Sequence, residues 1–304
     1  MVDLTLLGCG GNIPLPGRFL SSVFMNLGGR KILIDCGEGT QVSMRMKRCG
    51  FKDIDLICIT HTHGDHIIGL IGLLSTMGNS DRKEPVTIIG PVGIKDTLKA
   101  IKMLITLPYS LNIIEHPEGR FSINSNHLHN LEIETIDLEH SVECIGYNFY
   151  ISRQPKFSVE KALENNVPKK YWNMLQRGMS INFEDNFYTP DMVLGEDRRG
   201  IKISMTTDTR PVDTIPEFIE GADLFICESM YGDDMDISKA VKNKHMTFRE
   251  AAGLAVRGNV KQMLLTHFSP SMSEPSLFEE NAKSVFPNTI LGYDRLSMKL
   301  EFPK

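Results

Sequence analysis

The chain has 304 residues, of which 41% are hydrophobic and 23% are charged, the usage of an ordinary globular protein. This composition excludes a disordered or collagen-like chain. Its 33 basic and 38 acidic residues give a formal net charge of -5, which excludes a uniformly basic nucleic-acid coat protein but leaves room for a local basic patch.

Neither a membrane span nor an export signal is expected. The longest apolar runs, such as residues 67–74, are far shorter than the roughly 20 residues that cross a bilayer. The first residues, M-V-D-L, contain no basic region and no cleavage signal. The six cysteines are scattered without a C-x-x-C pair, so we expect free thiols and a cytoplasmic protein.

Short β-rich runs, bounded by glycine or turn residues, predict strands along the whole chain. The pair Gly28-Gly29 separates two early runs and indicates a hairpin. Both alternating and uniformly apolar runs occur, which is typical of mixed sheets partly covered by helices. The predicted strands are residues 2–7, 22–27, 31–35, 55–60, 86–89, 131–138, 144–151, 201–206, 224–227, 262–266 and 296–302.

From residue 39 onward, helical patterns alternate with the strands, which indicates a layered α/β fold. Thr247 and Glu250 form a T-x-x-E capping box, which predicts the start of a helix. Because no linker and no internal repeat divides the chain, we expect one domain over residues 1–304. The predicted helices are residues 41–48, 66–77, 93–105, 247–257 and 274–285.

The segment 152–178 differs in charge from the rest of the chain. It holds six basic and two acidic residues, a net charge of +4, and the only tryptophan, Trp172, beside Tyr171. Two interpretations are open: a pair of solvated amphipathic helices, or a face that contacts phosphates and offers aromatic groups for stacking. The basic residues are Arg153, Lys156, Lys161, Lys169, Lys170 and Arg177.

The clearest motif is H-x-H-x-D-H, formed by His61, His63, Asp65 and His66 directly after a predicted strand. Three imidazoles and a carboxylate at a strand-to-helix turn can converge on one point. Such nitrogen and oxygen donors suit Zn²⁺ and related divalent metals. Burying three histidines without a metal would leave their ring nitrogens without partners.

Three more ligand-type residues stand just after apolar runs. His140 follows residues 131–138, Asp208 follows 201–206, and His267 follows 262–266. Because loops at strand ends are where sites are usually built, we expect all three to join the motif at one edge of the sheets. Three histidines lie in polar loop contexts and are not assigned to the site: His116, His127 and His129.

Seven donors are more than one zinc ion needs. They suit two ions that share a bridging carboxylate and keep open positions for water. Two metals about 3.5–4 Å apart can activate the attacking water and stabilise both the attacking and the leaving oxygen at phosphorus. We therefore predict a two-metal hydrolase, with phosphodiesters as favoured substrates. The same donors also accept manganese or iron.

The sequence resembles the metallo-β-lactamase superfamily and, within it, the ribonuclease Z family of zinc phosphodiesterases, which trim transfer-RNA precursors at the 3′ end. D-C-G-E-G-T-Q at residues 35–41 narrows the match from the superfamily to the ribonuclease Z-like branch. Further support comes from L-G-C-G-G at 7–11, T-D-T-R-P at 207–211 and L-T-H at 265–267. The resemblance implies an α/β fold, a four-layer αββα sandwich of two mixed sheets with the site at one edge.

The resemblance also implies how the ligands are shared between two zinc ions. It assigns three residues to each ion and one aspartate to both: His61, His63 and His140; Asp65, His66 and His267; and the bridging Asp208. In the family, the aspartate that matches Asp65 is also the general base. A carboxylate beside a metal can accept the proton of the attacking water at neutral pH.

A general acid is implied on a separate loop. His245, in K-H-M-T at residues 244–247, matches a family histidine that protonates the leaving oxygen. Its family partner is the glutamate of an H-E-A-T stretch, and residues 227–230 here read C-E-S-M, so Glu228 is kept and its neighbours differ. We expect Glu228 to orient His245. From its local sequence alone, the alternative is that His245 is a capping or surface histidine.

Members of the family commonly grip transfer RNA with an arm inserted before the strand of the bridging aspartate, and residues 152–178 occupy that place. The long glycine-rich insertion is missing, and Lys169-Lys170 stand where a proline-glycine-proline turn is often found. The family commonly forms homodimers, so we expect a homodimer. The expected substrate contacts are Lys169, Lys170, Arg177 and Arg210.

The predicted function is that of a two-zinc endoribonuclease that removes the 3′ trailer from precursor tRNA. The first alternative is a phosphodiesterase of the same superfamily that acts on small molecules or cyclic nucleotides. The missing insertion and the altered stretch 227–230 favour this alternative slightly. The second alternative is a non-catalytic RNA- or metal-binding protein on the same scaffold, which the seven filled ligand positions disfavour.

Overall fold

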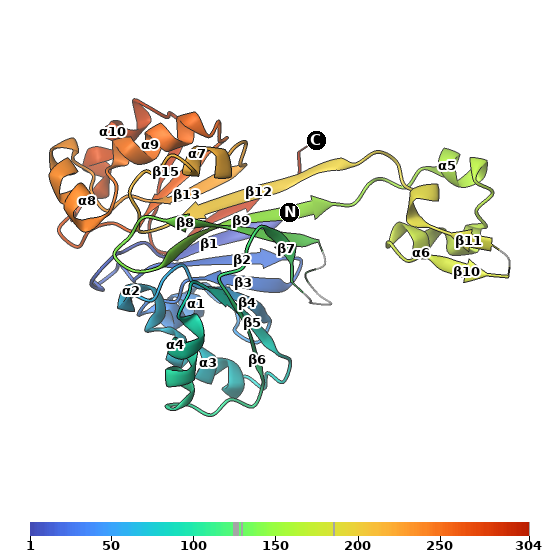
Figure 1. The fold of residues 1–304 in the computed structure, drawn as a ribbon, viewed down its shortest axis with the longest axis horizontal. Coiled ribbons are helices and arrows are strands. Elements are labelled where there is room, and N and C mark those ends of the chain that lie inside the picture. The colour runs from blue at the N-terminus through green and yellow to red at the C-terminus, as the bar shows by residue number, and fades with distance from the viewer. Residues whose placement is uncertain (124–127, 129, 185, 304) are drawn as a thin grey trace. The chain divides into compact units, whose positions relative to one another are not determined.

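A computed structural model describes residues 1–303 except 124–127, 129 and 185. The chain divides into two compact units (Figure 1). The first comprises residues 1–150 and 201–301, and the second comprises residues 151–200 and the chain end from 302. The basic segment 152–178 therefore lies within the second unit. Among the described residues, no helix has the length and apolar character that crossing a membrane requires.

Over the described residues, the first unit contains two seven-stranded sheets. The first has the strand order β16-β1-β2-β3-β4-β5-β6. Pairing is antiparallel from β16 to β3 and parallel from β3 to β6, so the sheet is mixed. The predicted hairpin joins β2 and β3, and Gly28 and Gly29 have φ of 61° and 99°, the left-handed region that favours glycine. The strands are β1 (Val2–Gly8), β2 (Ser22–Leu27), β3 (Arg30–Ile34), β4 (Ile54–Cys58), β5 (Val86–Gly90), β6 (Leu111–Glu115) and β16 (Leu296–Leu300).

The second sheet is also mixed and has the order β15-β14-β13-β12-β9-β8-β7. The pairs from β12 to β15 are parallel, whereas β7 and β8 are antiparallel. The central parallel strands β13 and β14 are short and fully buried, as expected for strands covered on both faces. The strands are β7 (Arg120–Ser122), β8 (Leu131–Leu138), β9 (Cys144–Arg153), β12 (Arg198–Thr206), β13 (Leu224–Glu228), β14 (Met263–Thr266) and β15 (Thr289–Leu291).

Helices cover the outer face of each sheet. Figure 1 shows α1, α3 and α4 beside the first sheet and α7, α9 and α10 beside the second, with the two sheets face to face between them. The predicted four-layer αββα sandwich of two mixed sheets is therefore confirmed. The helices of this unit are α1 (Thr40–Lys47), α2 (Gly64–Ile67), α3 (Leu70–Asn79), α4 (Ile94–Lys102), α7 (Ile215–Phe218), α8 (Ile237–Asn243), α9 (Phe248–Arg257) and α10 (Glu279–Lys283).

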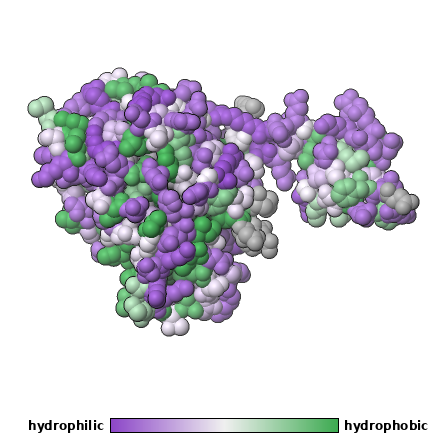
Figure 2. All heavy atoms as spheres, viewed as in Figure 1, coloured by the Kyte–Doolittle hydropathy of each residue, from purple (hydrophilic) through white to green (hydrophobic). Residues whose placement is uncertain are grey.

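Apolar side chains fill the spaces between these layers. Leu33 of β3, Leu73 of α3 and Leu98 of α4 are all completely buried in one core cluster. On the face drawn in Figure 2, hydrophilic residues cover much of the surface, with smaller apolar groups between them. Burial of the apolar stripes against the sheets is the main stabilising term, at roughly 25 cal/mol per Å² removed from water.

Two predicted helices differ from the structure. The helix predicted at residues 66–77 is divided into α2 and α3, near Gly69, where a Cβ atom would lie 2.2 Å from the carbonyl oxygen of Gly37. The one predicted at 274–285 consists of a 3₁₀ turn, Pro275–Phe278, followed by α10. The capping box of α9 is confirmed, since Thr247 Oγ1 accepts the Glu250 N–H at 3.3 Å and the Glu250 carboxylate accepts the Thr247 N–H at 2.9 Å.

The second unit has a small apolar core of its own. Leu175 and Tyr171 are buried in it, and Trp172 packs its ring against Phe157 with centroids 5.0 Å apart. The indole N–H of Trp172 donates to the carbonyl oxygen of Val167 at 2.9 Å, so the lone tryptophan helps to hold this unit together. The elements are α5 (Val159–Glu164), α6 (Trp172–Gln176), β10 (Ile181–Phe183) and β11 (Asn186–Tyr188).

Candidate two-metal site

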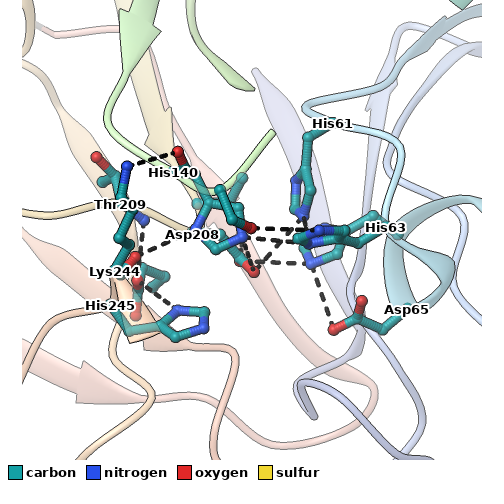
Figure 3. A network of polar contacts seen from close by, with 12 residues as sticks. His61, His63, Asp65, His140, Asp208, Thr209, Lys244 and His245 are labelled. Carbon is teal, nitrogen blue, oxygen red and sulfur yellow. Dashed lines mark hydrogen bonds and ion pairs between the residues drawn. The ribbon is translucent and has the colours of Figure 1, made fainter. Parts of the chain in front are cut away.

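The seven ligand-type residues predicted from the sequence lie at the carboxyl ends of strands from both sheets. Residues 61–66 follow β4 of the first sheet, whereas His140, Asp208 and His267 follow β8, β12 and β14 of the second. Figure 3 shows side chains from these strand ends pointing toward one another, with Asp208 near the centre. Because each strand is anchored in the core, the loops that carry the ligands start from fixed positions.

One cluster consists of His61, His63 and His140 around one oxygen of Asp208. Nδ1 of His63 lies 3.1 Å from Nε2 of His61 and 3.2 Å from Nε2 of His140. Oδ2 of Asp208 lies 3.6 Å from Nε2 of His61 and 3.7 Å from Nε2 of His140. Four donor atoms thus surround a single point.

The second cluster consists of Asp65, His66 and His267 around the other oxygen of Asp208. Oδ1 of Asp208 lies 3.4 Å from Nε2 of His66 and 3.2 Å from Nε2 of His267. These two nitrogens are 3.1 Å apart, and Oδ2 of Asp65 lies 3.3 Å from Nε2 of His267. Asp208 is therefore shared between the clusters, with one carboxylate oxygen facing each.

Both clusters fit a divalent cation in spacing. Ligand atoms bound to a tetrahedral zinc at about 2.0–2.1 Å lie about 3.4 Å from one another. The observed separations range from 3.1 Å, between His61 and His63, to 3.7 Å, between His140 and Asp208.

The chemistry of the donor atoms also fits a cation. Nδ1 of His66 donates its proton to the buried carboxylate of Asp35 at 2.7 Å, which leaves Nε2 of the same ring as an acceptor. That nitrogen faces the oxygens of Asp65 and Asp208, which are acceptors too. Acceptors that converge in this way are stabilised by a positive charge between them.

Asp35 supports both clusters, and sequence reasoning did not assign it a role in the site. Besides His66, its Oδ2 accepts the hydroxyl proton of Thr60 at 2.8 Å, and its Oδ1 accepts the Thr60 N–H at 2.8 Å. The Thr60 hydroxyl oxygen lies 3.2 Å from Nδ1 of His61. One buried carboxylate thus orients an imidazole in each cluster. Asp35 is the first residue of the D-C-G-E-G-T-Q string, which could have indicated this role but was used only to identify the family.

Two backbone groups also orient site residues, and these have no signal in the sequence. The N–H of Asn12 donates to Oδ2 of Asp65 at 2.7 Å. The carbonyl oxygen of Lys244 lies 3.2 Å from Nδ1 of His140, so the proton resides on that nitrogen and Nε2 faces the cluster.

Four residues at the site have left-handed backbone conformations although none is glycine. The φ angles of Asn12, Asp35, Lys244 and His267 are 68°, 56°, 56° and 62°. Each such residue costs on the order of 1 kcal/mol and persists because the surrounding structure over-determines it. Their concentration at the ligand-bearing loops is typical of a functional site.

His245 and Glu228 lie beside both clusters. Nδ1 of His245 is 3.0 Å from Oε1 of Glu228, which also accepts the N–H of Thr209 at 3.0 Å. The His245 ring centroid is 5.3 Å from that of His140 and 5.5 Å from that of His267. His245 is therefore a buried partner of the site rather than a surface or capping histidine.

The charge on Glu228 decides the protonation of His245. Burial lowers the pKa of this imidazole, but the ionised carboxylate of Glu228 outweighs burial and raises the pKa of His245 to about 9. The ring is therefore protonated at neutral pH and has a proton to give.

Asp65 has the opposite character. Burial raises its pKa, but the neighbouring imidazoles of His267 and His66 outweigh burial and lower it, so the carboxylate is ionised.

A cavity of about 730 Å³ opens onto this site. Its lining includes His63, Asp65, His140, Asp208 and His245, and its rim carries Lys242 and Lys244. The volume lies within the usual range of ligand pockets, and the two lysines suit an anionic ligand.

The four residues predicted to contact substrate fall into two groups. Lys169, Lys170 and Arg177 are exposed on the second unit, where Nζ of Lys170 lies 4.3 Å from the ring centroid of Phe183. Arg210 belongs to the first unit, and its guanidinium donates to the carbonyl oxygen of His245 and to the carboxylate of Glu250. Of the histidines not assigned to the site, His116 contacts Asp137 at 2.7 Å, and His127 and His129 lie outside the described residues.

Comparisons with known proteins agree with these motifs. Residues 2–286 match a family model described as Anti-Pycsar protein Apyc1. Ribonuclease Z of Clostridioides difficile strain 630 is 67% identical over 303 residues, and that of Clostridium beijerinckii is 56% identical over 305 residues, each alignment covering 99% of both chains. The crystal structure of the short form of human tRNase Z is 25% identical and superposes with a TM-score of 0.69 over 99% of this chain and 100% of that one. The chain therefore belongs to the ribonuclease Z family of metal-dependent endoribonucleases with a metallo-β-lactamase fold.

Proposed function

We propose that this protein is a two-zinc phosphodiester hydrolase that removes the 3′ trailer from precursor tRNA. The observation that carries the proposal is the shared Asp208, whose oxygens face two separate clusters of imidazole and carboxylate donors. Donor sets of this kind, at this spacing, favour zinc. The identity of 67% and 56% to two proteins named ribonuclease Z supports RNA as the substrate.

In this proposal the ligands are divided as the two clusters are. Bound zinc ions would activate the attacking water and offset the charge of the phosphate. Each cluster would supply three ligands of its own, and Asp208 would serve both: His61, His63 and His140 would hold one ion, and Asp65, His66 and His267 would hold the other.

The chain's own residues move the protons. Asp65 accepts a proton from the attacking water while the Asn12 N–H holds its Oδ2 in place. His245 delivers a proton from Nε2 to the leaving ribose oxygen, because Glu228 keeps its ring protonated and holds Nδ1 at 3.0 Å. Glu228 is itself fixed by the N–H groups of Thr209 and Met230, each at 3.0 Å, so the pair is held in one geometry.

The test is cleavage of a precursor tRNA with a 3′ trailer by zinc-loaded protein, with a chromogenic aryl phosphodiester in parallel. We expect accurate trailer removal by the wild type and by His116→Ala, a matched histidine outside the site, and none by His63→Ala. Turnover of the aryl diester without RNA cleavage would transfer the mechanism to small phosphodiesters. No turnover of either substrate by protein with two bound zinc ions would refute phosphodiesters as the substrate class.

We further propose that the exposed basic residues of the segment 152–178 contact the tRNA. Lys169 and Lys170 are exposed, and each lies over an aromatic ring, Trp172 and Tyr171. Replacing both lysines by alanine should weaken RNA binding and lower the slope of log affinity against log salt by roughly 1–2, because each phosphate contact releases about one counterion. Replacing Lys83 and Lys95, exposed lysines of the first unit, is the matched control. An unchanged slope in the Lys169 and Lys170 variant would remove this contact.

We also propose that the protein is a cytoplasmic homodimer. All six cysteines are free thiols, which suits a reducing compartment. The dimer rests on the family resemblance. Light scattering of the purified protein should give twice the mass of the chain, and the mass of a single chain at micromolar concentration would refute the dimer.

A further inference from the structure

Arg210 was expected to contact substrate, but its side chain is engaged inside the first unit. The guanidinium donates to the backbone carbonyl oxygen of His245 and forms a forked ion pair with Glu250. Its side chain is only 16% exposed, and that of Glu250 is 21% exposed. Its charge-assisted bonds therefore go to the loop that carries His245 and to the first turn of α9, the helix that follows this loop.

That loop joins α8 to α9 and is held at both of its ends. The N–H of His245 donates to the carbonyl oxygen of Ala240 at 2.9 Å, in the last turn of α8. Two residues later, Thr247 caps α9, and the Glu250 carboxylate that closes this capping box is the same group that Arg210 binds. Arg210 thus fixes both the carbonyl of His245 and the start of the next helix.

Arg210 is also close in sequence to the two clusters of ligand-type residues. Arg210 comes two residues after Asp208, which both metal clusters share. Between them, Thr209 donates its N–H to Glu228 at 3.0 Å, and Glu228 holds the ring of His245. Three consecutive residues therefore connect the site. Asp208 belongs to both clusters, Thr209 binds Glu228, and Arg210 binds the backbone of His245.

We propose that Arg210 is a positioning residue that holds His245 where it can protonate the leaving oxygen, an inference that rests on the proposed function. The forked, planar guanidinium reaches the carbonyl and both carboxylate oxygens at once, which the single ammonium of lysine cannot do. A displacement of a reacting group by about 1 Å costs on the order of 100-fold in rate. Loss of the fork should therefore reduce the delivery of the proton without changing the ligands of either cluster.

The experiment uses two substrates that differ in their need for an acid. A ribose oxygen is a poor leaving group and needs a proton, whereas a nitrophenolate leaves without one. For Arg210→Met and Arg210→Lys we expect kcat on precursor tRNA to fall roughly 10- to 100-fold. KM for the RNA, turnover of the nitrophenyl diester and the number of bound zinc ions should stay within twofold of wild type. Adding His245→Ala to Arg210→Met should reduce RNA cleavage no further than His245→Ala alone.

Arg249→Met is the matched control. Arg249 lies in the first turn of α9, as Glu250 does, and forms an exposed ion pair with Asp234 at 2.6 Å. We expect it to cleave both substrates like the wild type. A raised KM for RNA with unchanged kcat would overturn the proposal in favour of direct substrate contact by Arg210. Equal loss on both substrates, or loss of zinc, would overturn it in favour of a general structural role. If the wild type itself cleaves only the aryl diester, the proposed RNA substrate fails first, independently of Arg210.

Discussion

Replacing Asp35 by asparagine should weaken metal binding although Asp35 is not expected to touch a metal. The side chain is completely buried, and its oxygens accept protons from Nδ1 of His66 and from both the N–H and the hydroxyl of Thr60. Asparagine preserves the size of the side chain but replaces one of the two acceptor oxygens by an amide group that donates. Whichever way the amide turns, one of these donors then faces another donor.

The two orientations of the amide have different costs. If the amide nitrogen faces His66, the ring must carry its proton on Nε2, which removes the lone pair that a metal needs. Losses of this kind cost 10- to 100-fold in metal affinity, or about 1.4–2.7 kcal/mol. If the amide nitrogen faces the Thr60 N–H, a buried donor is left unpaired, which costs about 1–3 kcal/mol of unfolding free energy. We expect the cluster of His66 to lose more affinity than that of His61, because Asp35 reaches His61 only through Thr60.

The assay is a competition titration against a chromogenic zinc chelator, combined with urea unfolding of the metal-free protein. Asp137→Asn is the matched control, because Asp137 also lies 2.7 Å from a histidine nitrogen, that of His116, but outside the site and with 74% of its side chain exposed. We expect this control to bind two zinc ions with wild-type affinity. If Asp35→Asn retains both the zinc affinities and the unfolding free energy of the wild type, the reasoning is refuted.

Two further predictions concern His267 and His245. In Gly11→Ala the new Cβ would lie 2.5–2.8 Å from three ring atoms of His267, so we expect one bound zinc per chain and no RNA cleavage. Gly253→Ala is the control, because its Cβ meets open space, and it should bind two zinc ions. Metal analysis of both variants tests this prediction. In Glu228→Gln the loss of the carboxylate charge should lower the pKa of His245 from about 9, so the protonated acid is lost at a lower pH. The pH–rate profile for RNA cleavage should then decline at lower pH than that of the wild type, and identical profiles would contradict the assigned acid.

The strands whose apolar residues form a continuous or an alternating run could be predicted, because both patterns are local signals. The runs at residues 22–27 and 131–138 match β2 and β8 at both ends. The strands that were not predicted lie at sheet edges or are three residues long, such as β6, β7 and β15. They form because a neighbouring strand offers hydrogen bonds, and their own short runs are too weak a local signal to indicate this. The short helices α7 and α8 were missed, since tertiary packing stabilises helices of this length, whereas α5 and α6 lie in segment 152–178, where a helix pair was one of the two open interpretations.

The ligands could be predicted because metal-ligating residue types follow closely after the predicted strands. His140, Asp208 and His267 are far apart in the sequence, yet the end of an apolar run marks all three. The groups that orient them could not be predicted. The N–H of Asn12 and the carbonyl of Lys244 are backbone atoms that every residue carries, so only the path of the chain assigns them a role. The role of Arg210 depends likewise on the position of the His245 carbonyl, which sequence spacing does not reveal.

The packing of the two sheets determines whether the clusters can form at all. The ligands of residues 61–66 come from the first sheet and the remaining three from the second, so a shift of one sheet against the other would separate Asp208 from four of its six ligand neighbours. Two hydrogen bonds join the sheets directly before the ligand-bearing turn. Ile145 donates its N–H to the carbonyl oxygen of Thr60 at 2.9 Å, and Tyr147, completely buried, donates its hydroxyl proton to that of Ile59 at 2.7 Å. Thr60 also binds Asp35 and immediately precedes His61, so the inter-sheet contact and the orientation of the ligands depend on the same few atoms. The packing energy that holds the two sheets together therefore also fixes the geometry of the site.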